Sequence, residues 1–246
     1  MSGDLGSVSS RPFELVTFPN EQALADSVAE RWVQELRASG SRPFAVALAG
    51  GRITRRFLAS VASLCRKQAF PLDNVQFFWG DERCVPPTHP ESNFGVAQEH
   101  LLLPLAIKAH RIHRIRGELP EAQAAAEAET EICRTVPLDK ERQPILDLVF
   151  LGMGEDGHVA SLFPNETDAA VESRSVYRAV VASKPPPVRI TLGYAAIAAA
   201  RQVWVLASGS NKEAALRESL VQEGNTPLAR VIRLRQGTTI LTAFDF

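Results

Sequence analysis

The stretch from Leu146 to Pro164 constrains the fold of this chain more than any other. It begins with an almost continuous apolar run, residues 146–151, that only Asp147 interrupts. Strands that are buried on both faces of a parallel sheet have this pattern. A glycine-rich turn follows, and it carries two ionisable side chains, Asp156 and His158. Because ligands of open α/β sheets bind at the carboxyl ends of strands, this turn is predicted to be an active-site loop.

The same stretch contains the glycine spacing G-x-G-x-x-G, at Gly152, Gly154 and Gly157. After a strand, this spacing is typical of dinucleotide-binding sites, in which a full helix opens at the last glycine. Here Pro164 allows about two helical turns at most. No second strand ending in an acidic residue follows at the expected distance of about 20 residues. The glycine spacing alone therefore does not indicate a nucleotide site.

Strands and helices alternate along the rest of the chain, with no internal repeat and no linker. We predict one α/β domain over residues 13–246, built on a single doubly wound, mostly parallel sheet with helices on both faces, which is a Rossmann-like fold. Residues 1–12 are rich in glycine and serine and are predicted to be a disordered tail. The predicted strands are 44–48, 75–79, 146–151, 176–181, 188–192, 203–206 and 239–242, and the predicted helices include 21–39, 52–61, 93–102, 120–134, 195–200 and 210–221.

Composition excludes several classes of partner. The formal net charge is −1 over 246 residues, which gives no reason to expect a nucleic acid or an anionic membrane. No apolar run approaches the length of a membrane span. Three widely spaced cysteines suit a reducing compartment, so we expect the cytoplasm. His110 and His113 have a spacing that is compatible with a metal, but no third ligand lies nearby in the sequence, and we interpret them as surface residues.

Three further places suggest a functional site. Gly50 and Gly51 lie between a strand and a helix, where backbone N–H groups alone can bind an anion, although a tight turn that binds nothing has the same sequence. The charged run 81–83 follows the next strand, although such clusters are often solvated loops. Lys212 lies in the first turn of a predicted helix, where a cation is disfavoured unless an anion is bound.

Four motifs, in this order, resemble the 6-phosphogluconolactonase family, within a larger group that includes the glucosamine-6-phosphate deaminases. They are GDERCVPPTHPESN (Gly80–Asn93), GMGEDGHVASLFP (Gly152–Pro164), KPPPVRITL (Lys184–Leu192) and GSNK (Gly209–Lys212). The resemblance runs from about residue 14 to the end of the chain. Asp81-Glu82-Arg83 and the segment 160–164 have the lactonase form rather than the deaminase form.

One motif departs from the family pattern. The glycine loop of the family usually reads Ser-Gly-Gly-Ser-Thr-Pro, whereas this chain has Ala49-Gly50-Gly51-Arg52-Ile53-Thr54. Both serine hydroxyls are missing, so phosphate contacts from those side chains are in question. The backbone N–H groups remain, and Arg52 is a candidate to supply a charge in their place.

The resemblance implies hydrolysis of 6-phosphoglucono-δ-lactone to 6-phosphogluconate in the oxidative pentose phosphate pathway, by a monomer or small homo-oligomer. In this reading His158 takes a proton from water, Asp156 or Asp81 orients its imidazole, and Arg83 stabilises the charge that develops on the carbonyl oxygen. Metal and organic cofactors are not required. The residues expected to bind the substrate or its phosphate are Gly50, Gly51, Arg52, Asn93, Gly154, Arg189 and Lys212.

The sequence alone leaves other interpretations open. His158 could be a core histidine and Asp156 a helix cap. A glucosamine-6-phosphate deaminase or isomerase would use the same crevice with Asp81 as a proton shuttle. A non-catalytic sugar-phosphate sensor would keep Arg189 and Lys212 without needing His158. The lactonase forms of the motifs argue against the deaminase, and the retention of Asp156, His158 and Arg83 argues against the sensor.

Overall fold

The computed structural model describes residues 12–244. The tail that the sequence predicts over residues 1–12 lies outside this range except for Pro12, and so does the end of the chain at residues 245–246.

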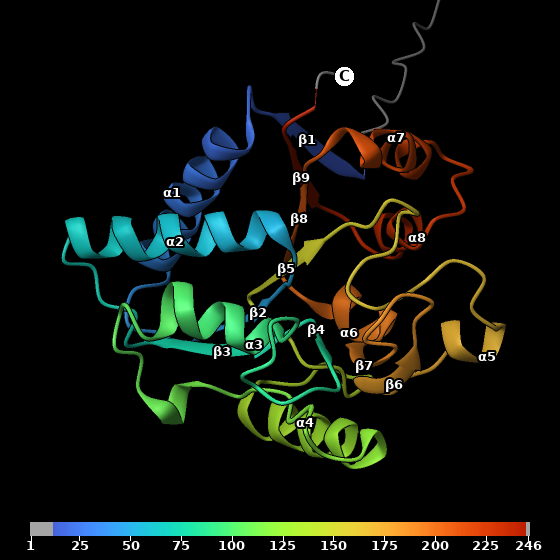
Figure 1. The fold of residues 1–246 in the computed structure, drawn as a ribbon, viewed down its shortest axis with the longest axis horizontal. Coiled ribbons are helices and arrows are strands. Elements are labelled where there is room, and N and C mark those ends of the chain that lie inside the picture. The colour runs from blue at the N-terminus through green and yellow to red at the C-terminus, as the bar shows by residue number, and fades with distance from the viewer. Residues whose placement is uncertain (1–11, 245–246) are drawn as a thin grey trace, which may run out of the picture.

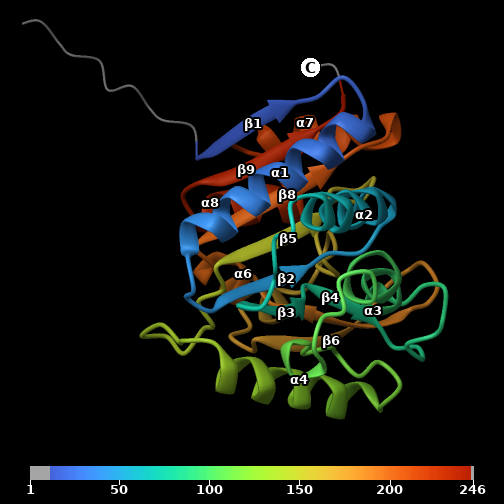
Figure 2. The same cartoon turned by 90° about the vertical axis from the view of Figure 1, so that its left-hand side faces the viewer.

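The molecule is built around a six-stranded sheet in the order β1-β9-β8-β5-β2-β3, in which every neighbouring pair is parallel (Figure 2). Its inner strands are almost wholly buried, as their continuous apolar sequences predict. The strands are β1 (Phe13–Thr17), β2 (Phe44–Leu48), β3 (Val75–Trp79), β5 (Leu148–Gly152), β8 (Gln202–Ala207) and β9 (Thr238–Thr242).

Helices cover both faces of this sheet, which confirms the predicted fold class. In Figure 1, α1, α2 and α3 lie on one side of the sheet and α6, α7 and α8 on the other. The bounds are α1 (Glu21–Ser39), α2 (Arg52–Lys67), α3 (Asn93–Ala97), α4 (Glu121–Thr135), α5 (Asp168–Val171), α6 (Tyr194–Ala199), α7 (Glu213–Leu220) and α8 (Pro227–Leu234), with a π-helical turn η1 (Gln98–Leu102) and 3₁₀ turns η2 (Ala109–Arg111) and η3 (Ser210–Lys212).

The sheet has its topological switch point between β2 and β5. From β2 the chain proceeds outward to β3, whereas from β5 it proceeds through β8 and β9 in the opposite direction. At such a point the connections leave the carboxyl ends of two adjacent strands on opposite sides and open a crevice. Here the two strand ends lead into the Gly50-Gly51 turn and the Gly152–Pro164 loop. They approach so closely that a Cβ on Gly152 would lie 3.3 Å from the carbonyl oxygen of Gly50.

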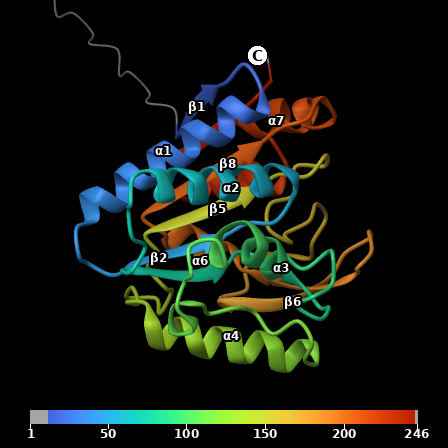
Figure 3. The ribbon, with the colours of Figure 1, turned by 60° about the vertical axis from the view of Figure 1, so that its left-hand side comes forward.

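A second, three-stranded antiparallel sheet has the order β4-β7-β6, from β4 (Asp81–Arg83), β7 (Val188–Leu192) and β6 (Tyr177–Val181). Helix α4 packs on it at the β3 end of the molecule (Figure 3). The sequence predicts β6 and β7 as strands but does not reveal this separate sheet. The two strands pair with each other in an antiparallel way because the connection over residues 182–187 is long enough for a hairpin but too short for a parallel crossover.

Some elements were missed and one interpretation was wrong. Strand β1 is a half-exposed edge with no clear alternation, and the four-residue α5 is too short to leave a pattern. Helix α8 was also missed, although its sequence carries the usual signals of a helix start, with Thr226 as N-cap and Pro227 in the first turn. The interpretation of His113 as a surface residue is wrong, because its ring stacks on Phe78 and is almost buried. Within residues 12–244 no helix is long and apolar enough to cross a membrane.

Candidate active site

A pocket of about 230 Å³ opens at the switch point, and five segments of the chain converge on it. They are the Gly50–Ile53 turn, β4 with the start of α3, the end of β5 with the loop after it, the segment from Lys184 into β7, and the loop before α7. Its walls contain Gly50, Gly51, Arg52, Ile53, Asp81, Arg83, Asn93, Gly152, Met153, Gly154, Glu155, His158, Ala160, Lys184, Arg189 and Lys212. Every predicted site residue except Asp156 therefore lines one pocket, and Asp156 contacts His158 directly.

His158 and Asp156 form a close pair. Nδ1 of His158 lies 2.6 Å from Oδ1 of Asp156, which also accepts a hydrogen bond from the backbone N–H of His158. Burial acts to raise the Asp156 pKa, but the hydrogen bonds and the charge of His158 outweigh it, so that this pKa lies below its ordinary value. An ionised carboxylate only accepts hydrogen bonds, so the Nδ1 that faces it carries a proton, and in the neutral imidazole Nε2 has the lone pair. His158 is thereby set up to accept a proton through Nε2.

Glycine is required at position 154 by the position of this imidazole. A Cβ on Gly154 would overlap the His158 ring. The N–H of Gly154 donates to the carbonyl oxygen of His158 at 2.9 Å, which closes the loop. This amide is therefore already used, and the expectation that it binds substrate is not supported by its hydrogen bonding. The contribution of Gly154 is steric. The loop also contains no helix for Asp156 to cap, because Val159 forms isolated bridges with Met153 and Leu162.

The two arginines of the site are cross-strand neighbours. Arg83 on β4 pairs with Arg189 on β7 in the antiparallel sheet. Like charges in opposite positions destabilise a sheet. Burial lowers the pKa of Arg189, and the charge of Arg83 lowers it further. Arg83 is partly compensated by Glu91, which lies 2.7 Å from its Nη1, but its buried Nε has no hydrogen-bond partner. The pair concentrates positive charge where an anionic group would relieve the repulsion.

Asp81 does not contact the imidazole and is held in a separate buried network. Its carboxylate accepts hydrogen bonds from Ser161 Oγ at 2.7 Å and from Asn93 Nδ2 at 3.1 Å. Of the two carboxylates expected to orient His158, the structure therefore selects Asp156. Asn93 also packs against Gly50, where a Cβ would collide with its amide group. Asp81 and Asn93 thus tie the glycine turn, β4 and the His158 loop to one another.

Glu82 fixes the geometry of this corner, although it was not among the predicted site residues. Its carboxylate accepts from the backbone N–H groups of Arg83, Asn93 and Phe94 and from the hydroxyl of Ser92. Burial raises its pKa to about 7, although the three backbone donors act to lower it. An acidic residue in the middle of a run of three charged residues is expected to be solvent-exposed, so only the fold shows that Glu82 is 2% exposed.

The raised pKa of Glu82 predicts a pH-dependent contribution to stability. Between about pH 4.5 and pH 7 the folded protein holds a proton that the unfolded chain has released, so the free energy of unfolding falls as pH rises through this range. For a fully raised pKa the loss is about 3 kcal/mol. Urea unfolding of the wild type and of Glu82→Gln, which cannot titrate, isolates this contribution as the difference between them. The wild type should lose stability relative to Glu82→Gln as pH rises, and a gain relative to Glu82→Gln would place the carboxyl pKa below its ordinary value instead.

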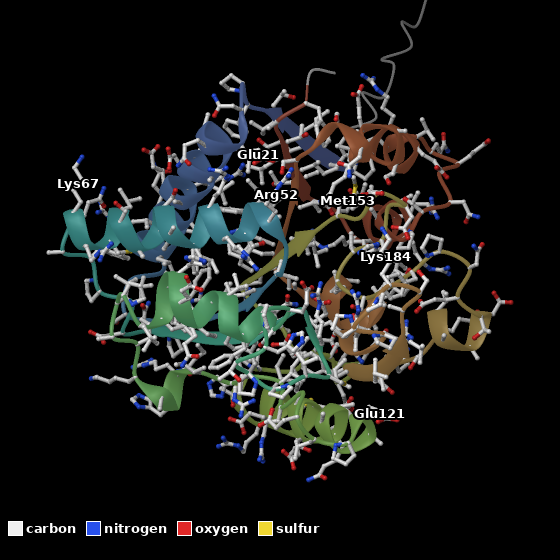
Figure 4. All side chains as sticks on the ribbon, in the orientation of Figure 1. Glu21, Arg52, Lys67, Glu121, Met153 and Lys184 are labelled. Carbon is white, nitrogen blue, oxygen red and sulfur yellow. The ribbon has the colours of Figure 1, made fainter. Side chains whose placement is uncertain are left out.

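A second group of charges surrounds the glycine turn. Gly51 is the N-cap of α2 with φ of 100°, and its lack of a side chain leaves the first N–H groups of the helix without a side-chain cap. Burial lowers the pKa of Lys212, the charge of Arg52 lowers it further, and Glu155 and Glu21 oppose this. Arg52 donates to Glu21 at 2.9 Å (Figure 4), and its Nη2 would lie 3.2 Å from a Cβ on Gly209. Arg52 thus lies between α1 and the loop of Lys212.

The donor set does not suggest a metal. Among residues 12–244 there is no cluster of three or more His, Cys, Asp or Glu side chains with the arrangement of a metal site. His113, whose spacing from His110 is compatible with a metal, has its two ring nitrogens within hydrogen-bond distance of Glu131 and Gln76 instead. The pocket holds one imidazole, with one carboxylate beside it, and several cations.

Comparison with known proteins places this arrangement in context. The sequence profile described as "Glucosamine-6-phosphate isomerases/6-phosphogluconolactonase" matches residues 19–241. A 6-phosphogluconolactonase of Streptomyces coelicolor is 36% identical over 219 residues, which cover 86% of this chain and 84% of that protein. The solved structure of 6-phosphogluconolactonase from Trypanosoma brucei superposes with a TM-score of 0.82 at 28% identity, over 95% of this chain and 97% of that one. A monomeric glucosamine-6-phosphate deaminase shares the fold, with a TM-score of 0.77 at 17% identity over 94% of this chain and 97% of that one.

Proposed function

The chain belongs to the family of glucosamine-6-phosphate isomerases and 6-phosphogluconolactonases, and from this premise we propose that it hydrolyses 6-phosphoglucono-δ-lactone to 6-phosphogluconate. The proposal includes a place in the oxidative pentose phosphate pathway, in the cytoplasm. The three cysteines are all unpaired, which suits a reducing compartment. The lactone hydrolases among the relatives, which match most of this chain, support the reaction class.

One observation carries the proposal. The imidazole of His158 has Nδ1 bound to Asp156, and the same pocket contains the guanidinium groups of Arg83 and Arg189. A base that is oriented by a carboxylate and lies beside cations is the arrangement that ester hydrolysis by an activated water needs. The sensor alternative would need none of this pairing.

The proposed reaction has two steps. In the first, a water oxygen attacks the lactone carbonyl while Nε2 of His158 takes one of its protons, and the carbonyl oxygen becomes negatively charged. Arg83, which lines the pocket, stabilises this charge. In the second step the bond between the carbonyl carbon and the ring oxygen breaks, and His158 returns the proton to that oxygen. Asp156 stabilises the imidazolium between the two steps.

The phosphate of the substrate would lie on the cationic side of the pocket. It carries about two negative charges near neutral pH. Lys212, Arg189 and the N–H groups at the start of α2 are its proposed partners, because both side chains line the pocket and those N–H groups have no side-chain cap. Binding of the phosphate, which is remote from the reacting carbon, would place the lactone carbonyl next to His158. The reaction requires no metal or organic cofactor.

The reaction class is decided by two parallel assays on one enzyme preparation. Acid release from freshly made 6-phosphogluconolactone, corrected for spontaneous hydrolysis, should be fast. Ammonia release from glucosamine 6-phosphate should stay at the background level. The opposite pattern would make the chain a deaminase, and activity in neither assay with retained binding of 6-phosphogluconate would make it a sensor.

Arg52 is proposed to replace part of the phosphate contact that the family's serines provide. It is 71% exposed in its pair with Glu21, and an exposed ion pair is worth about 1 kcal/mol at most. A charge-assisted hydrogen bond to phosphate is worth about 1.5–3 kcal/mol, so phosphate can displace Glu21 as the partner of this guanidinium.

Arg52→Ala is therefore expected to weaken binding of 6-phosphogluconate by roughly tenfold, which is about 1.4 kcal/mol. Arg52→Ser should recover part of the loss, and Glu21→Gln should leave Arg52 free and tighten binding slightly. Isothermal titration calorimetry with the product measures all three. If Arg52→Ala binds the product as tightly as the wild type, Arg52 takes no part in the site.

A further inference from the structure

The aromatic side chain of Phe163 lies just outside the pocket and contacts two of the residues that line it. The ring of Phe163 lies 5.0 Å from the His158 ring, centroid to centroid, at an interplanar angle of 50°. The guanidinium carbon of Arg189 lies over the same ring, 5.7 Å from its centroid. Phe163 therefore contacts both the proposed base and a proposed phosphate ligand.

The position of this ring is fixed by buried hydrogen bonds two residues away. Ser161 donates through its hydroxyl to Asp81, and its backbone N–H donates to Thr191 Oγ1 at 3.1 Å. Thr191 and Arg189 are two residues apart on β7 and so point to the same face of the strand. The bond from Ser161 to Thr191 thus brings the segment that carries Phe163 to Arg189.

Arg189 needs such a contact because its other partners are weak. Its Nε and Nη2 donate to the carbonyl oxygens of Pro186 and Lys184 at 3.2 and 3.3 Å. Its cross-strand neighbour Arg83 repels it. The face of an aromatic ring attracts a guanidinium and restricts its orientation without neutralising its charge. A carboxylate in the same position would neutralise Arg189 and compete with phosphate.

His158 has a similar requirement. Asp156 is hydrogen-bonded to one edge of the imidazole. Gly154 packs so close to the ring that a Cβ there would overlap it. The ring of Phe163 limits rotation of the imidazole about its hydrogen bond to Asp156. The direction of Nε2 is then determined by three contacts rather than one.

We propose that Phe163 is a positioning residue that holds His158 and Arg189 in register, so that the group that binds phosphate and the group that activates water keep a fixed separation. This rests on the proposed function for the roles of the two residues. Phe163 contributes no reacting group, and its effect passes through both partners. Replacing it should therefore lower turnover and phosphate affinity together, whereas changes in His158 or Arg189 affect mainly one of them.

The test compares Phe163→Leu, which removes the ring, with Phe163→Tyr, which keeps it. Phe70→Leu is the matched control, since Phe70 makes a comparable contact with Arg37 at the opposite end of the molecule. Turnover of 6-phosphogluconolactone gives kcat, and calorimetric titration with inorganic phosphate gives affinity without requiring activity. We expect Phe163→Leu to lower kcat about tenfold and to weaken phosphate binding about fivefold, from the range of cation–π and aromatic contacts. Phe163→Tyr and Phe70→Leu should stay within twofold of the wild type.

The same substitution in the Arg189→Ala background separates coupling from general disturbance. With Arg189 absent, Phe163→Leu should no longer change phosphate affinity but should still lower kcat relative to Arg189→Ala alone. An equal loss of phosphate affinity in both backgrounds would overturn the proposal, as would a Phe163→Leu variant with wild-type kcat and affinity. A wild type that binds phosphate but does not hydrolyse the lactone would refute the proposed function, while the phosphate titrations would still decide whether Phe163 acts through Arg189.

Discussion

His158→Gln is expected to lower kcat for lactone hydrolysis by about 10² to 10⁴, which is the usual contribution of a general base. Gln is close in size to His and can keep a hydrogen bond to Asp156, but it cannot take a proton from water. The loop should keep its shape, because Gly154 and Gly157 close it through backbone contacts. Initial rates of acid release at saturating lactone measure the effect.

His110→Gln is the control, since His110 is exposed on η2 and does not line the pocket. It should have wild-type rates. Calorimetry with inorganic phosphate should show that His158→Gln binds the anion normally. A His158→Gln enzyme within threefold of the wild type would remove this residue from the mechanism.

Arg189→Ala and Lys212→Ala should each raise KM far more than they lower kcat. Both side chains are placed to grip a phosphate that is remote from the reacting carbon, so their loss weakens ground state and transition state alike. Removing one charge-assisted hydrogen bond of about 1.5–3 kcal/mol corresponds to roughly 10- to 150-fold in affinity. Product inhibition by 6-phosphogluconate measures the loss independently of turnover.

Two exposed cations serve as controls for the change in net charge. Arg134→Ala alters α4, and Lys67→Ala alters the far end of α2, where Figure 4 shows Lys67 pointing away from the molecule. Neither should change product inhibition. If Arg189→Ala and Lys212→Ala are inhibited by product as strongly as the controls, the phosphate site lies elsewhere.

Sequence reasoning predicted the fold class because the inner strands are continuous apolar runs that end in glycine turns. Phe44–Leu48 and Val75–Trp79 have the predicted bounds. It also assigned the site to the carboxyl ends of strands, because parallel strands present those ends at one edge. The pocket at Gly50, Arg83 and His158 has this location.

The contacts within the site could not be predicted in the same way. The choice of Asp156 over Asp81 as the partner of His158 depends on loop geometry, since both carboxylates follow apolar strands. The pairing of Arg83 with Arg189 is set by the register of an antiparallel sheet whose two strands are more than 100 residues apart in sequence. Glu82 reads as one of three charged residues, and only folding buries it against the start of α3. Charge and hydropathy patterns describe single elements, whereas these contacts join two.

The central claim is that His158 activates a water molecule for direct attack on the lactone carbonyl. The most direct measurement is a single turnover in H₂¹⁸O with enzyme in excess over 6-phosphogluconolactone, followed by mass spectrometry of the product. Direct attack predicts one ¹⁸O atom in the carboxylate of 6-phosphogluconate and none in its C5 hydroxyl group. An unlabelled carboxylate after the first turnover would show that a protein group such as Asp156 attacked the carbonyl, and label at C5 would show that the other carbon–oxygen bond was cleaved. Either result would contradict the account.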